Sequence, residues 1–215
     1  MKKFRLAVIL ILLFLFSITA QAVVLEQAPF DGGDGSLSVG PSGVQIATDD
    51  LQFSNTVQLT TISWWGSYDP DVPATESFTV RLFADDGFGN PETNAFFETI
   101  FTGNGDSSGG LVDSIGSTVF QYDLGVNQLL QGGVNYYLSV FSNDSTQDWY
   151  WLESATGNNT GWSRQTDGDA WKFDAVTLNM SFQLTADAVV SAPITLLLMI
   201  LPMLWLGRLA RKEVR

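Results

Sequence analysis

Apolar and polar residues alternate along much of the chain, which is the pattern of strands with one buried face. The clearest case is Val176–Leu184, where Val, Leu, Met, Phe and Leu alternate with Thr, Asn, Ser and Gln. A period of two predicts a strand whose apolar side chains, including Met180 and Phe182, all point into a core. Alternation or a short apolar run also occurs at residues 44–47, 51–53, 57–65, 78–83, 96–102, 118–124, 134–140 and 149–153.

Turn-forming stretches rich in Asp and Gly separate these runs. They lie at residues 31–35, 85–91, 103–110 and 157–161. The stretch between the two ends of the chain shows no amphipathic helix of three turns. About eight to ten short strands with such spacing predict an all-β fold, an antiparallel β-sandwich of jelly-roll-like type. One domain over residues 23–187 is long enough to bury its own core.

The N-terminus has the three parts of a secretory signal peptide. Basic residues at 2, 3 and 5 precede an unbroken apolar run, Leu6–Phe16, and small residues Ala20 and Ala22 follow. We therefore expect residues 1–22 to form a signal helix that is cleaved after Ala22. The alternative is an uncleaved membrane anchor, although the apolar run is short for a span.

The C-terminal segment 188–215 also has three parts. A small-residue and proline element precedes an apolar run, Ile194–Leu206, and a basic end. The apolar run predicts a transmembrane helix over about residues 194–209, with the basic end in the cytoplasm and the domain outside. The alternative is a permanent single-pass anchor. The residues of the two outer elements are Val190, Ser191, Ala192, Pro193, Arg208, Arg211, Lys212 and Arg215.

This tail resembles a PEP-CTERM sorting signal, which bacterial exosortases recognise. The usual core of that signal is Val-Pro-Glu-Pro, and Val190-Ser191-Ala192-Pro193 resembles its Ser-Ala-Pro variant. The resemblance implies export, a stop in the inner membrane, processing near Pro193 by an exosortase-type enzyme, and release to the cell surface or extracellular matrix. It also implies a host that produces exopolysaccharide. The middle of the chain is similar to uncharacterised exported β-sandwich proteins with the same kind of tail.

Composition limits the chemistry that the domain can perform. The chain has no Cys and no His, which excludes a disulfide framework, a zinc site of the usual ligands and His-based acid–base catalysis. The net charge is −13, and removing the seven bases and one acid of the two terminal signals leaves about −19. Only Arg81, Arg164 and Lys172 are basic in the domain. So acidic a surface excludes nucleic acid as a partner.

Aromatic residues form the first candidate site, because their flat faces can stack on sugar rings. Trp and Tyr are dense at residues 64–68, 149–151, 162 and 171. Alternation sends neighbours to opposite faces, so about half of them should be buried. We expect Trp65, Tyr150 and Trp162 to be exposed and to be the candidate sugar-binding residues.

Acidic turns form the second candidate site. Calcium prefers six to eight oxygen ligands, which Asp-rich turns can supply. Asp85, Asp86, Asp167 and Asp169 are candidate ligands for a structural calcium ion, although Asp is also simply a good turn residue. No other cofactor is expected.

The sequence favours a non-enzymatic protein over an enzyme. A glycosidase needs two facing carboxylates, and nothing in the sequence pairs Glu76, Glu92, Glu98 or Glu153 with a partner. The prediction is an exosortase-sorted surface or extracellular-matrix protein associated with exopolysaccharide. The alternative is a secreted carbohydrate-binding module that uses exposed Trp and Tyr.

Overall fold

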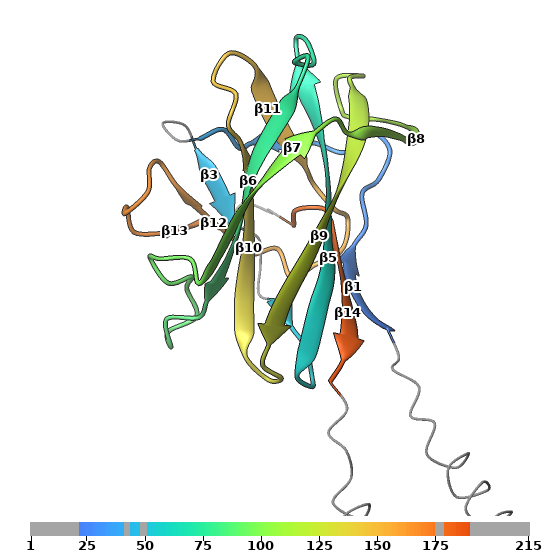
Figure 1. Cartoon of the computed structure of the whole chain (residues 1–215). Helices are drawn as coiled ribbons and strands as arrows, with labels where there is room; N and C mark the ends of the chain where they lie inside the picture. Colours follow the sequence, from blue (N-terminus) through green and yellow to red (C-terminus); the bar gives the residue numbers. More distant parts are fainter. Residues whose placement is uncertain (1–21, 41–43, 48–50, 175–178, 190–215) are drawn as a thin grey trace, which may run out of the picture. The chain divides into compact units, whose positions relative to one another are not determined.

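The computed structural model describes residues 22–40, 44–47, 51–174 and 179–189, and every regular element in these ranges is a strand (Figure 1). All strand pairs in the described ranges are antiparallel. The prediction of an all-β, antiparallel fold is confirmed. The same ranges contain no helix long and apolar enough to cross a membrane. The predicted signal helix and transmembrane helix lie outside the described residues.

The first sheet is built around the long strand β5. β5 pairs with β9 along one edge and with β14 and then β11 along the other. β14 pairs in turn with β1, β11 with β2, and β9 with β8. Its strands are β1 (Ala22–Gln27), β2 (Gly35–Leu37), β5 (Val57–Asp69), β8 (Asp106–Val112), β9 (Thr118–Leu130), β11 (Asp148–Leu152) and β14 (Phe182–Ala188).

The second sheet has β10 and β6 at its centre. The strand order is β13-β12-β3-β10-β6-β7, and β4 also pairs with β10. Its strands are β3 (Gln45–Ala47), β4 (Leu51–Gln52), β6 (Glu76–Ala84), β7 (Phe97–Gly103), β10 (Asn135–Ser142), β12 (Gly161–Arg164) and β13 (Lys172–Asp174).

The two sheets face each other, and their apolar faces meet in one core (Figure 1). Met180, Phe182 and Leu184 are all buried in it, which confirms the predicted inward face for these residues. Val176 and Leu178 lie outside the described residues. Trp64 stacks on Tyr122 with ring centroids 5.4 Å apart and meets Phe78 edge-on at 5.7 Å.

Each sheet also buries apolar side chains on its outer face. Trp65, on the face of β5 opposite Trp64, packs with Val119 and Leu152. Phe83, Tyr137 and Trp162 form a similar cluster on the outer face of the second sheet, covered by Trp171 and Ala95. Outer faces that are half covered in this way explain why β6 and β10 are buried along nearly their whole length.

Three expectations about strand boundaries were wrong. The described ranges hold fourteen strands rather than eight to ten. The expected turn 103–110 is largely taken up by β8, a Gly- and Ser-rich strand that pairs with β9. The last strand is Phe182–Ala188, and Met180 precedes it in an isolated bridge to Glu153. Short strands without apolar alternation leave little signal in a sequence.

Candidate functional site

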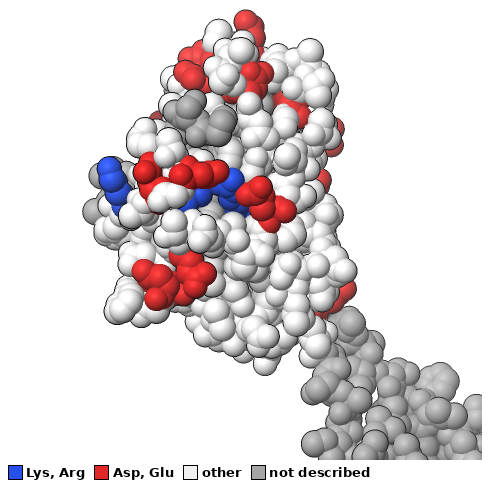
Figure 2. All heavy atoms as spheres, turned by 60° about the vertical axis from the view of Figure 1, so that its left-hand side comes forward, with Lys and Arg blue, Asp and Glu red and all other residues white. Residues whose placement is uncertain are grey.

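The few basic side chains of the domain gather on the outer face of the second sheet. Residues 22–189 contain three bases, Arg81, Arg164 and Lys172, and each lines one of two hollows of about 250 Å³. Arg164 lines both hollows, so the two are neighbours. Figure 2 shows the blue atoms of these bases in a band with red carboxylates beside them. This cluster is the most distinctive polar feature of an otherwise acidic surface.

Alternation along β6 places Arg81 at this site. Val80 and Leu82 point into the core, so Arg81 between them points to the outer face. Arg164 is the last residue of β12, and Asp167 lies in the loop that follows. The loop turns back tightly because Gly168 adopts a φ of 89° and because the Asp169 carboxylate accepts hydrogen bonds from Thr166 N at 3.0 Å and Thr166 Oγ1 at 2.8 Å. That turn presents Asp167 to both arginines.

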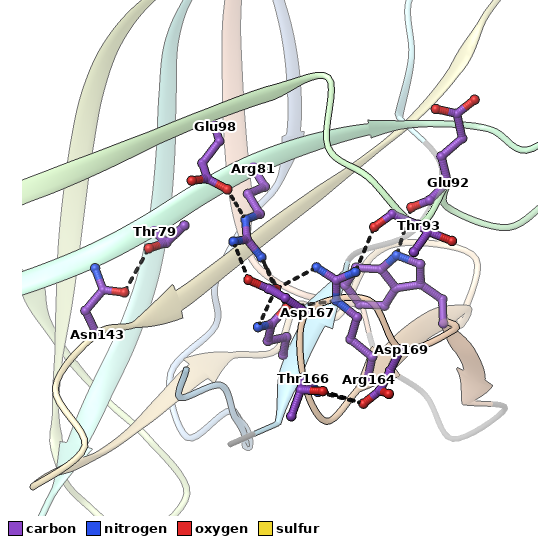
Figure 3. Close-up of polar contacts among 12 residues, drawn as sticks. Thr79, Arg81, Glu92, Thr93, Glu98, Asn143, Arg164, Thr166, Asp167 and Asp169 are labelled. Carbon is purple, nitrogen blue, oxygen red and sulfur yellow. Dashed lines mark hydrogen bonds and ion pairs between the residues drawn. The ribbon is translucent and has the colours of Figure 1, made fainter. Parts of the chain in front are cut away.

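Asp167 is held by both guanidinium groups (Figure 3). Arg81 donates from Nη1 to Asp167 Oδ1 at 2.5 Å and from Nη2 to Oδ2 at 2.9 Å, a bidentate pair. Arg164 donates from Nη2 to Oδ1 at 3.0 Å. Arg81 Nε also donates to Glu98 Oε2 at 2.6 Å, so Arg81 lies between two carboxylates.

The arginines themselves are buried and fixed in place. Arg81 is 8% exposed and Arg164 is 3% exposed. Arg164 donates from Nε to Gln45 Oε1 at 2.8 Å and from Nη1 to the Thr93 carbonyl oxygen at 2.9 Å (Figure 3). Its guanidinium lies 4.4 Å from the centroid of the Trp171 ring, a distance at which cation–π attraction contributes. Each guanidinium group is therefore held by several contacts within the protein.

The charged groups of the site pair with one another: Arg81 with Glu98 and Asp167, and Arg164 with Asp167. Hydrogen bonds from Arg81 lower the pKa of Asp167 to about 2, against the opposing effect of burial. Burial lowers the pKa of Arg164. Two guanidinium groups and two carboxylates cancel in charge. Because Asp167 is ionised at any ordinary pH, it cannot act as a general acid, and the arrangement suits hydrogen bonding to a polar ligand.

The three candidate sugar-binding residues do not share a surface. Trp65 is 6% exposed and Trp162 is 5% exposed, so the expectation that they are exposed was wrong. Tyr150 is half-buried. Because Tyr150 pairs with Ser67 on β5, it lies with Trp65 on the outer face of the first sheet, whereas Trp162 belongs to the second sheet. The expectation that about half of the clustered aromatic residues are buried holds for the Trp residues. At least five of the seven Trp in the chain are buried: Trp64, Trp65, Trp149, Trp151 and Trp162.

The candidate calcium ligands already accept hydrogen bonds from the protein. Asp85 Oδ1 accepts from Gly87 N at 2.6 Å, and its Oδ2 accepts from Tyr137 OH at 2.8 Å. Asp86 Oδ1 accepts from Phe88 N at 2.8 Å. Across the part of the chain that the structure describes, no three acidic side chains gather as a metal site would require. Calcium binding by Asp85, Asp86, Asp167 and Asp169 stays a prediction.

A second polar centre lies inside the core, and the sequence reading missed it. Glu76 is 1% exposed, and its carboxylate accepts hydrogen bonds from Tyr122 OH at 2.6 Å and from Gly105 N at 2.5 Å. Burial raises the pKa of Glu76 and that of the nearby Tyr68. The signal was available, because Glu76 has the same parity in β6 as the inward residues Phe78 and Val80. This centre is enclosed, whereas the arginine site opens to solvent.

The fold and the site define an antiparallel β-sandwich domain with an ion-paired surface site. The chain belongs to the family described as a domain of unknown function (DUF7901), whose model matches residues 25–198. That match spans the sandwich from β1 to β14 and names no activity.

Other comparisons add little. No curated protein matches this chain in sequence. Among solved structures, the crystal structure of the infectious bursal disease virus VP2 subviral particle is similar, at 7% sequence identity and a TM-score of 0.31. The likeness covers 83% of this chain and 43% of the viral chain, so this chain spans less than half the length of that protein. So low a TM-score carries no argument about function.

Proposed function

We propose that this protein is a non-enzymatic, exported surface or extracellular-matrix protein that an exosortase-type system sorts and that associates with exopolysaccharide. The observation that carries the proposal is the three-part tail, in which Val190–Pro193, the apolar run Ile194–Leu206 and four bases follow one another. In this proposal a cleaved signal helix starts export. A transmembrane helix over about residues 194–209 then holds the protein in the inner membrane until processing.

The borders of the folded unit support this route. The compact unit runs from Gln21 to Ala188, close to the predicted domain 23–187. Ala22 at the start of β1 pairs with Asp187 near the end of β14, so the two ends of the sandwich are adjacent. All buried residues of the main core lie between Val39 and Ala186. Cleavage after Ala22 and near Pro193 would therefore leave that core intact.

The sandwich also fits a jelly-roll-like connectivity, which we propose as its finer class. Successive strands change sheet repeatedly, at β5 to β6, β7 to β8 and β9 to β10. Such crossings are typical of Greek-key and jelly-roll sandwiches. No cofactor is part of the proposal.

A secreted carbohydrate-binding module is the second candidate function. The observation that favours it is the polar hollow lined by Arg81, Glu98 and Asp167. Ion pairs hold the side chains of these three residues to one another. A surface site of this kind could bind the matrix polymer while the tail provides the sorting.

The proposal is tested by fractionating cells of an exopolysaccharide-producing host that has an exosortase-type enzyme. We expect the wild-type protein in the surface or matrix fraction. In a strain that lacks the enzyme, we expect a longer form that retains Arg211–Arg215 in the membrane fraction. Deletion of residues 2–16 is the control and should keep the protein inside the cell. An unchanged distribution in the enzyme-deficient strain would refute exosortase sorting.

A further inference from the structure

We propose that the hollow beside Arg81 binds one sugar unit of a neutral polysaccharide, with Glu98, Asp167 and Asn94 as the contacting residues. The inference rests on the proposed association with exopolysaccharide, and it specifies the ligand class and the place of binding. It does not depend on Trp65, Tyr150 or Trp162, which the fold does not bring together. Of these three residues, only Trp162 lies on the same outer face as Arg81, and its side chain is buried.

The size and lining of the hollow fit a single sugar ring. Its volume of about 250 Å³ is just below the range of about 300–1,000 Å³ that is common for drug-sized ligands. The side chains around it are almost all polar. The polar ones belong to Arg81, Thr93, Asn94, Glu98, Arg164 and Asp167, and Ala95 and Gly168 complete the lining. Such a lining suits a ligand with many hydroxyl groups and few apolar faces.

The carboxylates of the site keep hydrogen-bonding capacity for a ligand. The Glu98 and Asp167 side chains are each 53% exposed, although both are held by Arg81 on their inner side. Glu98 Oε2 accepts from Arg81 Nε, and no hydrogen bond among the described residues uses Oε1, which can therefore accept one from a ligand. Hydrogen bonds to charged groups are about twice as strong as neutral ones, and neighbouring hydroxyls of a sugar can pair with them. The amide of Asn94, on the exposed loop before β7, adds a donor and an acceptor.

Charge selects a neutral ligand over an ionic one. The two arginines and two carboxylates of the site cancel, so neither an anion nor a cation gains a net local attraction. The surrounding domain carries about −19, which repels anionic polymers at long range. A neutral glycan meets no such penalty. Because Arg164 also lines the second hollow with Lys172 and Asp169, the next sugar unit of a chain can lie there.

The test is affinity gel electrophoresis of the full chain in a zwitterionic detergent that has no sugar headgroup. Gels contain neutral glucan, neutral galactomannan or anionic alginate. We expect at least one neutral polysaccharide to retard the protein more than alginate does. Asn94→Ala and Glu98→Gln should each weaken that retardation by about 3- to 10-fold in apparent Kd, the loss of one hydrogen bond. Glu26→Gln, an exposed carboxylate on β1, is the matched control and should change nothing.

Several results would overturn the inference. They are no retardation by either neutral polymer, preference for alginate, or equal retardation of the wild type and both variants. Thermal unfolding of each variant shows whether it is folded, and Asn94→Ala still tests the site if Glu98→Gln unfolds. A protein that reaches the matrix without binding either neutral polymer refutes this site alone. A protein that is not exported refutes the proposed function, whatever the gels show.

Discussion

Replacing Trp162 by alanine separates a structural role of this residue from a ligand-binding role. The indole is 5% exposed and packs edge-on against Tyr137, with ring centroids 4.8 Å apart. Its Nε1 donates a hydrogen bond to Asn90 Oδ1 at 3.3 Å. Trp162 therefore joins β12 to the centre of the second sheet and to the loop after β6.

The magnitude follows from burial. Removing a buried Trp side chain costs about 3–5 kcal/mol, and the outer cluster is small enough to relax, which favours the lower end. If Trp162→Ala lowers the free energy of unfolding by about 3 kcal/mol, the Tm of a domain of this size should fall by about 6–12 °C. The hydrogen bond to Asn90 is long and contributes little to that loss.

Chemical and thermal unfolding of the full chain, followed by far-UV circular dichroism, measure the effect. Phe173→Ala is the matched control. The centroids of the Phe173 and Trp162 rings are 5.6 Å apart, but Phe173 is 56% exposed. We expect the control to cost less than about 1 kcal/mol. If Trp162→Ala leaves the unfolding midpoint unchanged, the packing argument for the outer cluster is wrong.

Three further predictions concern charged groups. Burial raises the pKa of Glu76 from 4.5, so the native state holds a proton that the unfolded state has lost, and stability should fall as pH rises above 4.5. Glu76→Gln should abolish that slope in urea midpoints measured from pH 4 to pH 8. Asp167→Asn should cost on the order of 1 kcal/mol near pH 7, because solvent screens a half-exposed carboxylate. That cost should shrink as pH falls from 3.8 to about 2, the folded pKa of Asp167. If the acidic turns bind calcium, chelation should lower Tm and added calcium should restore it, because a ligand that binds only the folded state stabilises that state. Equal responses to calcium and magnesium at equal ionic strength would contradict a specific site.

The alternation of apolar residues predicted the core strands well. Trp64, Phe78, Leu138 and Phe182 lie in strands that the pattern marked, and all four are buried in the main core. Such strands can be predicted from the local sequence, because the polarity of each residue indicates whether its side chain faces the core or the solvent. β1 and β8 were missed, since their partly exposed residues show no such contrast.

The pattern could not show whether an outer face is covered. Trp65 and Trp162 were expected to be exposed, yet side chains from distant segments bury both of them. Leu111 of β8 packs with the cluster around Trp65, and Trp171 packs with the cluster around Trp162. Exposure therefore depends on contacts between segments far apart in the chain.

The arginine site depends on such contacts even more strongly. Arg81 and Asp167 are 86 positions apart, and Gln45 joins them from 122 positions before Asp167. Asp167 appeared in the sequence only as a candidate calcium ligand in an acidic turn. The scarcity of bases was visible, and three bases among 22 acids could have been expected to find carboxylate partners. Which carboxylates they find is set by the pairing of β6, β10, β3 and β12.

The proposed function requires that the protein is exported and then processed at both ends. Intact mass spectrometry of the protein recovered from the cell surface or matrix tests it most directly. We expect one species that begins at Val23 and lacks the stretch from about Ile194 onward. A surface species that still carries Arg211–Arg215 would contradict removal of the tail and leave a permanent membrane anchor in its place.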